Sequence, residues 1–435
     1  MVLIYSNITS SRLQYTCNFI FTELLGVEFA ITVDSESFSN YDGVKVNYSD
    51  QSFASATLNL SPAALLFETG IQLQPITCFE VNGYKAFFKN NAGDFPFDIF
   101  AATFYLFSRY EEYLPHTKDS YGRYAHENAL AYKEGFLDLP LINIWVNDFA
   151  VTIKNRFPAF NLQHSTFSFL PTYDIDIAYS YKYKGLARNL GGFLASPSLS
   201  RIKVLLGLQK DPFDTYAWLN ELHRKNNLTP IYFFLLAEKN SVYDKNILPH
   251  KHAMWQLVQQ HAKKYTVGIH PSWQSGDNDA LLKKEIEEFA AMVQAPANGM
   301  APTISRQHYI RFNLPGGYQK LIDAGITDDY SMGYGSINGF RASVANSFMW
   351  YDLQQEQQTT LRIHPFCFMD ANAFYEQDFS TAQANEELLH YYTTCKKLDT
   401  PLITIWHNNF FGTDQQFEGW REMYAQFISI VSSEA

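Results

Sequence analysis

The sequence predicts an α/β protein in which a small α+β domain, residues 1–160, precedes a larger domain, residues 161–435, built on a parallel sheet. The chain has 435 residues, more than a single hydrophobic core usually serves. After about residue 160, short β-rich runs alternate with longer amphipathic stretches. Such alternation is typical of parallel strands joined by helical crossovers, arranged as an open sheet or as a (β/α) barrel.

The first 160 residues lack this regular alternation. Short alternating stretches such as 44–48 (VKVNY) are mixed with two apolar helical patterns, at 100–113 (FAATFYLFSRYEEY) and 141–153. The mixture indicates a small α+β domain, and its residue types do not indicate a role.

The second part contains five β-rich runs and four helical patterns. The runs are 166–170, 231–236, 266–269, 361–366 and 402–406, and the helical patterns are 215–225, 253–264, 280–293 and 382–397. Ionisable residues fall at the ends of several runs. At the carboxyl ends of parallel strands such residues are typical of an active site.

Composition limits the partners and the compartment. The net charge is −11 and no Lys/Arg-rich block compensates for it, so a nucleic-acid partner is not expected. No apolar run reaches the roughly 18 residues of a membrane span, and the first residues lack the features of a signal peptide, so no membrane partner is expected. The four cysteines are far apart, which fits a reducing compartment, and we expect the cytoplasm.

The first run continues into a strand expected at 167–176, which ends in two aspartates. In Thr172-Tyr173-Asp174-Ile175-Asp176 one residue separates the acids, so period-two alternation places Asp174 and Asp176 on the same side. Two carboxylates on one face suit a divalent cation, with one as a ligand and the other as a base. The alternative is an Asp pair that caps the next helix or a turn.

Three histidines and an arginine occupy similar places. His270 ends the third run, His407 ends the fifth, and Arg306 and His308 follow a Gly/Pro-rich connection at 295–302. Taken singly, each is more often a hydrogen-bonded core, turn or surface residue than a functional one. Together with the two acids they match a catalytic metal centre, which needs about three protein ligands and one open position for water.

At these residues the chain resembles the polysaccharide deacetylase family, whose catalytic domain is called the NodB homology domain. Five short motifs in a fixed order define that family. The first is matched at 172–176, the third by Arg306-Gln307-His308-Tyr309 and the fifth at 403–407, a hydrophobic strand that ends in His407. The resemblance extends from about residue 167 to 411 and implies a distorted or incomplete (β/α) barrel.

The resemblance also implies a role for each matching residue. Asp174 is the catalytic base and Asp176 a metal ligand. Arg306 orients Asp174, the backbone N–H of Tyr309 serves the oxyanion, and His407 is the general acid. The metal is a divalent cation, expected to be zinc.

The second and fourth motifs depart from the family pattern. His270 matches the first ligand histidine of the second motif, but Gln274 stands where the second is expected, and His308 is our candidate substitute. The fourth motif is matched only weakly, at 328–333. Asp370 and His364 are further candidates to line the same cleft.

The implied function is that of a zinc-dependent hydrolase that removes acetyl groups from N-acetylated or O-acetylated carbohydrate. Gln274 leaves open a catalytically inactive carbohydrate-binding protein with the same fold, and a hydrolase of another amide or ester is a third possibility. Residues 97–124 resemble an uncharacterised domain that precedes such deacetylase domains in some bacteria.

Overall fold

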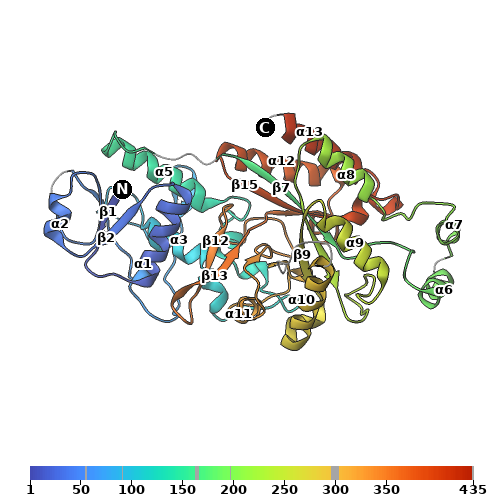
Figure 1. Ribbon diagram of the computed structural model, residues 1–435. Coiled ribbons are helices and arrows are strands. Elements are labelled where there is room, and N and C mark those ends of the chain that lie inside the picture. The colour runs from blue at the N-terminus through green and yellow to red at the C-terminus, as the bar shows by residue number, and fades with distance from the viewer. Residues whose placement is uncertain (54–55, 91, 162–165, 196, 295–302, 434–435) are drawn as a thin grey trace.

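The computed structural model describes residues 1–435 except 54–55, 91, 162–165, 196, 295–302 and 434–435. Figure 1 shows an N-terminal lobe, coloured blue to cyan, beside a larger lobe built on a curled sheet. The predicted connection at 295–302 lies outside the described residues. Within the described ranges, every helix is too short or too polar to cross a lipid bilayer.

The N-terminal lobe contains a four-stranded parallel sheet in the order β2-β1-β3-β4. Its strands are β1 (Val2–Tyr5), β2 (Phe29–Thr32), β3 (Val44–Tyr48) and β4 (Leu58–Leu60), and an antiparallel pair, β5 (Phe79–Val81) and β6 (Tyr84–Ala86), follows. The helices are α1 (Ser11–Cys17), α2 (Ser35–Asn40), α3 (Ile99–Phe107), α4 (Leu130–Lys133) and α5 (Leu141–Arg156). Every residue of α3 is buried, which explains why its sequence is apolar on all faces.

The larger lobe is built on nine strands in the order β12-β13-β11-β10-β9-β8-β7-β15-β14. Eight are parallel, and the edge strand β12 runs antiparallel to β13. The strands are β7 (Ser168–Ile175), β8 (Ile231–Leu236), β9 (Thr266–Pro271), β10 (Ile304–Ser305), β11 (Asp328–Asp329), β12 (Phe348–Asp352), β13 (Gln357–Ile363), β14 (Phe368–Met369) and β15 (Pro401–His407). The order ends at β12 and β14, so the described sheet is an incomplete barrel. The predicted α/β fold with a distorted (β/α) barrel is confirmed.

Helices connect and cover the parallel strands. They are α6 (Leu186–Ala195), α7 (Leu199–Leu205), α8 (Tyr216–Lys225), α9 (His252–Ala262), α10 (Asp279–Gln294), α11 (Gly316–Asp323), α12 (Thr381–Lys397) and α13 (Trp420–Ser433). All six residues of β8 are buried, as expected for a parallel strand covered on both faces. In Figure 1, α6 and α7 project away from the sheet at the right.

Two strands have other bounds than the β-rich runs. β7 continues past the run 166–170 to Ile175, as expected for the strand at 167–176, because this stretch pairs with both β8 and β15. Asp174 therefore lies inside the strand. β13 begins and ends earlier than the predicted 361–366, since its polar first residues form an antiparallel ribbon with β12.

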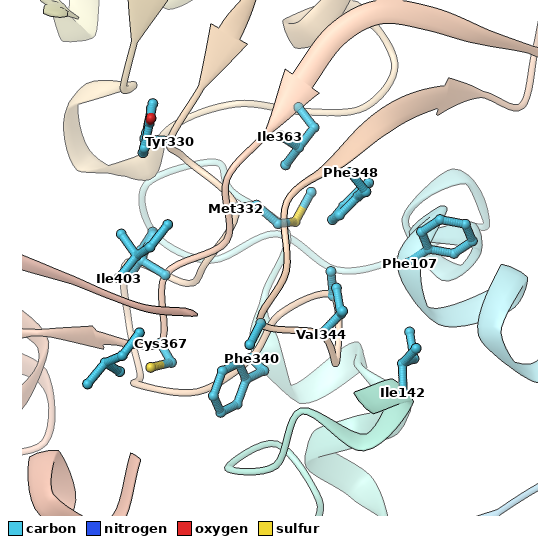
Figure 2. Packing of buried hydrophobic residues seen from close by; sticks show 14 of the residues in the cluster. Phe107, Ile142, Tyr330, Met332, Phe340, Val344, Phe348, Ile363, Cys367 and Ile403 are labelled. Carbon is cyan, nitrogen blue, oxygen red and sulfur yellow. The ribbon is translucent and has the colours of Figure 1, made fainter. Parts of the chain in front are cut away.

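One continuous hydrophobic core joins the two lobes. Figure 2 shows Phe107 and Ile142 of the N-terminal lobe near Phe340, Val344 and Phe348 of the larger lobe. The rings of Phe107 and Phe348 pack edge to face with their centroids 5.5 Å apart. The lobes are therefore packed against each other through apolar side chains, and the division at residue 160 stays a prediction.

A buried charge network also connects the lobes. Glu112 accepts hydrogen bonds from Arg109 Nε at 2.7 Å and from Arg341 Nη2 at 2.6 Å, and each of the three side chains is only 1% exposed. Burial by itself would raise the pKa of Glu112, but the charges and hydrogen bonds of Arg341 and Arg109 lower it to about 2. The folded state therefore favours the ionised form of the Glu112 carboxyl.

Removing the charge of Glu112 is expected to destabilise the fold. The pKa of this carboxyl is lower in the folded chain than its ordinary value of about 4.3, so its stabilisation is complete above that pH. This contribution to the free energy of unfolding is lost as the pH falls from about 4.3 through about 2. Its size is roughly 3 kcal/mol. We expect Glu112→Gln to lower the free energy of unfolding at pH 7 by about 3 kcal/mol, measured by urea denaturation.

The exposed Glu80, whose carboxylate is 3.9 Å from Lys85 Nζ, provides the matched control. Glu80→Gln is expected to change the free energy of unfolding by less than about 0.5 kcal/mol. Equal stability of the Glu112→Gln and Glu80→Gln variants at pH 7 would contradict a stabilising role for the network.

Candidate metal centre

The carboxyl edge of the larger sheet gathers the ionisable residues that the sequence singled out. Parallel strands in the order β10-β9-β8-β7-β15 bring their carboxyl ends to one edge. The residues are Asp174 in β7, Asp176 directly after it, His270 in β9, Arg306 and His308 after β10, and His407 at the end of β15.

Asp176, His270 and His308 form a group that could hold a metal ion. One ligand atom from each lies within 4.8 Å of the other two. His270 Nε2 is 3.2 Å from Asp176 Oδ1, and His308 Nε2 is 3.3 Å from Asp176 Oδ2. Two ligands that bind one zinc ion at about 2 Å in tetrahedral geometry lie about 3.3 Å apart, so these separations suit a shared ion.

The chemistry of this group also fits a cation. Asp176 Oδ1 is buried and accepts no hydrogen bond from the residues that the structure describes, an arrangement that costs free energy unless a cation is bound. Burial by itself would lower the pKa of His308, but the carboxylates of Asp176 and Asp244 raise it to about 9. The negative charge that raises this pKa also favours a divalent ion.

Each histidine of the group is oriented through its other ring nitrogen. His270 Nδ1 donates to the carbonyl of Arg306 at 2.5 Å, and His308 Nδ1 donates to Asp244 Oδ1 at 3.1 Å. Both acceptors place the proton on Nδ1, an assignment that follows from the hydrogen-bond network. Nε2 of each ring therefore faces Asp176 as a potential ligand atom.

Gln274 contributes to the site through Asp244. Gln274 Nε2 donates to Asp244 Oδ2 at 3.1 Å, and the backbone N–H of Trp273 donates to Asp244 Oδ1 at 2.8 Å. Asp244 is fully buried, and it is the carboxylate that orients His308. Gln274, at the position of the second histidine in the deacetylase pattern, therefore contacts the carboxylate that orients the candidate ligand His308.

Loss of Asp244 is therefore expected to weaken metal binding more than loss of Gln274. Asp244→Ala should reduce zinc affinity about 10- to 100-fold, the usual cost of removing a group that orients a ligand histidine. Gln274→Ala should cost less than about tenfold, because Asp244 keeps its bonds to His308 and Trp273. Competition with a chromophoric chelator measures both affinities. Complete loss of zinc by Gln274→Ala would show that Gln274 is itself a ligand.

Asp174 is held by a buried arginine. Arg306 Nη1 donates to Asp174 Oδ1 at 2.7 Å, and the Arg306 guanidinium lies 4.3 Å from the centroid of the Phe233 ring, with no part of the side chain exposed. The other oxygen, Asp174 Oδ2, is 3.8 Å from His270 Nε2. Arg306 therefore fixes the orientation of Asp174, with one carboxylate oxygen beside the candidate metal ligands.

His407 is held in a comparable way by Asp370, which is fully buried. Its Nδ1 donates to Asp370 Oδ1 at 2.6 Å and its backbone N–H donates to Asp370 Oδ2 at 2.7 Å. His407 Nε2 is 3.4 Å from Asp176 Oδ2. Burial opposes the charged ring, but the Asp370 and Asp176 carboxylates raise the pKa of His407 well above its ordinary value. Both carboxylates therefore favour the charged form of the His407 imidazole, which lies beside the metal group.

These residues line one pocket of about 520 Å³, a volume typical of small-molecule sites. Asp174, Asp176, His270, His308 and His407 form part of its wall. Tyr309, in the left-handed region with φ 58°, lines it as well. Arg306 lies behind the wall and acts through Asp174.

Sequence reasoning missed Asp244, which orients His308, and it missed Tyr121 and Arg123 among the residues that line the pocket. It gave Asp370 only a secondary place. Asp244, Tyr121 and Arg123 come from loops without a periodic pattern, so no local signal marked them. The signal for Asp370 was its place after a short apolar run.

The segment 328–333, the weak match to the fourth motif, lies outside the pocket lining. Asp328 pairs with His364 at 2.9 Å, and Asp329 accepts hydrogen bonds from Ser305 and Ser331. His364 is thus engaged with Asp328 instead of lining the cleft.

The fold and this edge define an incomplete (β/α) barrel with a possible metal site. Residues 2–158 match the model of a family of unknown function, DUF7033. A solved structure of a protein provisionally classed as a polysaccharide deacetylase, from Mycobacterium smegmatis, has a TM-score of 0.41 and 12% identity over 62% of this chain and 85% of that chain. The 4-alpha-glucanotransferase from Thermococcus litoralis has a TM-score of 0.36 and 10% identity over 62% of this chain and 38% of its own. No curated protein matches the chain. Both structural likenesses are distant, so the function has to be argued from the site.

Proposed function

We propose that this chain is a metal-dependent carbohydrate deacetylase, a hydrolase that removes acetyl groups from an N-acetylated or O-acetylated sugar. The observation that carries the proposal is the placement of two different acid–base groups beside one candidate metal group. Asp174, oriented by Arg306, lies on the β7 side, and His407, oriented by Asp370, lies on the β15 side. Such a pair suits hydrolysis, which requires a base for the water and an acid for the leaving group.

Asp176, His270 and His308 are the residues that would hold the metal. A divalent ion such as zinc supplies a Lewis acid and lowers the pKa of water. Asp174 Oδ2 accepts the proton of the attacking water, and Arg306 keeps that oxygen in position. The backbone N–H of Tyr309 faces the developing oxyanion, the contribution that is typically largest in acyl transfer.

His407 completes the reaction as the general acid. The leaving amine or alkoxide needs a proton, and His407 Nε2 carries one because Asp370 favours the charged ring. Asp370 thus acts on the reaction through His407, in the way that a buried carboxylate orients a catalytic histidine in other hydrolases.

A catalytically inactive carbohydrate-binding protein is the second candidate. It is favoured by one observation: Gln274 stands where the deacetylase pattern has a ligand histidine, and its amide N–H donates to Asp244. It is opposed by the retention of Asp174, Arg306 and His407, since these groups serve proton transfer and not sugar contact.

The test combines metal content and deacetylation on the full-length protein. We expect purified protein to carry about one zinc per chain by mass spectrometry, and to release acetate from tetra-N-acetylchitotetraose. Chelation should remove both zinc and activity, and added zinc should restore both. A chain that takes up no metal when zinc is supplied would exclude the deacetylase mechanism and favour the binding protein.

A further inference from the structure

A tight turn of the N-terminal lobe, residues 118–124, reaches the pocket of the larger lobe. Lys118 and Tyr124 form an antiparallel bridge, and Asp119 Oδ1 accepts hydrogen bonds from the backbone N–H groups of Tyr121 and Arg123, both at 2.9 Å. Gly122, with φ 76°, adopts the left-handed conformation at the tip. The turn is therefore held by its own hydrogen bonds, and it presents Tyr121 and Arg123 to the pocket.

Arg123 fastens this turn to the backbone beside the candidate metal ligands. Its Nε donates to Asp119 at 2.6 Å and its Nη1 donates to the carbonyl of Tyr309 at 2.8 Å. A Cβ at Gly335 would lie 2.0 Å from Arg123 Nη1 and 2.8 Å from the Tyr309 oxygen, so only glycine allows this approach. The N-terminal turn is thus fixed to the residue that follows His308.

Aromatic rings from both lobes line this side of the pocket. Tyr121 stacks on Tyr309 with centroids 5.3 Å apart, and Tyr243 meets Tyr309 edge to face at 5.4 Å. Trp273 stacks on Tyr243 at 4.2 Å. Tyr121, Tyr243 and Tyr309 are each only partly buried and line the pocket. We call these three rings the aromatic wall.

We propose that the aromatic wall is a binding subsite for a pyranose ring next to the metal centre, and that Tyr121 of the N-terminal lobe is its stacking residue. The active site is then incomplete without the N-terminal lobe. This assignment rests on the carbohydrate ligand of the proposed function and gives a role to the region that matches DUF7033.

The chemistry of the wall fits a sugar ring. The C–H face of a pyranose is apolar and its hydroxyl edge is polar, and partly exposed tyrosine rings present an apolar face with a polar tip. Polar side chains, including Gln307 and Asn409, line the same pocket and suit the hydroxyl edge. The Tyr121 ring also contacts the Arg123 guanidinium, 4.7 Å from its centroid, and it still lines the pocket. Arg123 and Asp119 fasten the turn through hydrogen bonds that do not involve this ring.

The test measures binding of tetra-N-acetylchitotetraose by titration calorimetry. The zinc-loaded full-length Asp174→Asn protein serves as the parent, so that turnover does not consume the probe. Tyr121→Ala is expected to weaken binding about five- to tenfold, the value of one aromatic stacking contact. Tyr121→Phe, which keeps the ring, should bind within about twofold of the parent. Tyr132→Ala removes a tyrosine of the same lobe that is 43% exposed and outside the pocket, and it should not change the affinity.

Measuring the zinc content of the same preparations distinguishes failure of the deacetylase proposal from failure of the subsite proposal. We expect equal zinc in all variants, because Tyr121 is not a ligand. Parent-like binding by Tyr121→Ala would overturn the subsite, and so would a zinc-loaded parent that does not bind the probe. If the chain takes up no zinc but Tyr121→Ala still loses affinity, the deacetylase proposal fails and the sugar subsite stands.

Discussion

Replacing Asp174 by asparagine is expected to reduce turnover about 10²- to 10⁴-fold, the usual value of a general base. Asparagine has nearly the same shape and still accepts a hydrogen bond from Arg306, so the local structure should persist. It cannot take a proton from water. Zinc content should remain at the wild-type level, because the three candidate ligands are Asp176, His270 and His308. Acetate release and metal analysis on the same sample measure both effects.

Asp328→Asn is the matched control for this prediction. Asp328 also belongs to a strand of the sheet and forms a close ion pair, with His364 at 2.9 Å, but it does not line the pocket. Its replacement should leave turnover within about twofold of wild type. An Asp174→Asn protein that hydrolyses the substrate at the wild-type rate would remove Asp174 from the role of base.

Replacing His308 by alanine is expected to abolish stoichiometric zinc binding, with a loss of affinity larger than the 10- to 100-fold cost of losing only an orienting group. The change removes one of three candidate ligands and leaves the buried Asp244 without its imidazole partner. Activity should fall with the metal content. Mass spectrometry of dialysed protein and competition with a chelator measure the affinity.

His364→Ala is the control here, because His364 pairs with Asp328 and Ser347 away from the pocket. It should bind zinc as wild type does. A His308→Ala protein that retains one tightly bound zinc would mean that another side chain completes the site, and it would exclude His308 as the substitute ligand.

Gln274 and His308 both contact Asp244, which lies between them. His308 follows β10, and its Nε2 is 3.3 Å from the Asp176 carboxylate, a separation that suits two ligands of one zinc ion. If the proposed function is correct, His308 would take the place of the second histidine of the deacetylase pattern, and Gln274 would support it through Asp244.

The parallel sheet and the residues at its edge could be predicted from local patterns in the sequence. Apolar runs such as 231–236 predict buried strands because they must be covered on both faces, and β8 has those bounds. Asp174, His270 and His407 were found because they end or nearly end such runs, and parallel strands carry these ends to one edge. This information is local, so it can be read without knowing the rest of the fold.

The groups that hold these residues in place could not be predicted in this way, because they are brought together by folding. Asp244, Tyr121 and Arg123 belong to loops whose residue types have no period, and their partners are distant in the chain. Asp370 likewise orients His407 through a hydrogen bond to a residue 37 positions away in the sequence. Hydrogen bonds and ring contacts of this kind form only when segments that are distant in the sequence pack together. Local sequence patterns therefore specified which side chains reach the edge of the sheet, and only the packed chain specified their orientation.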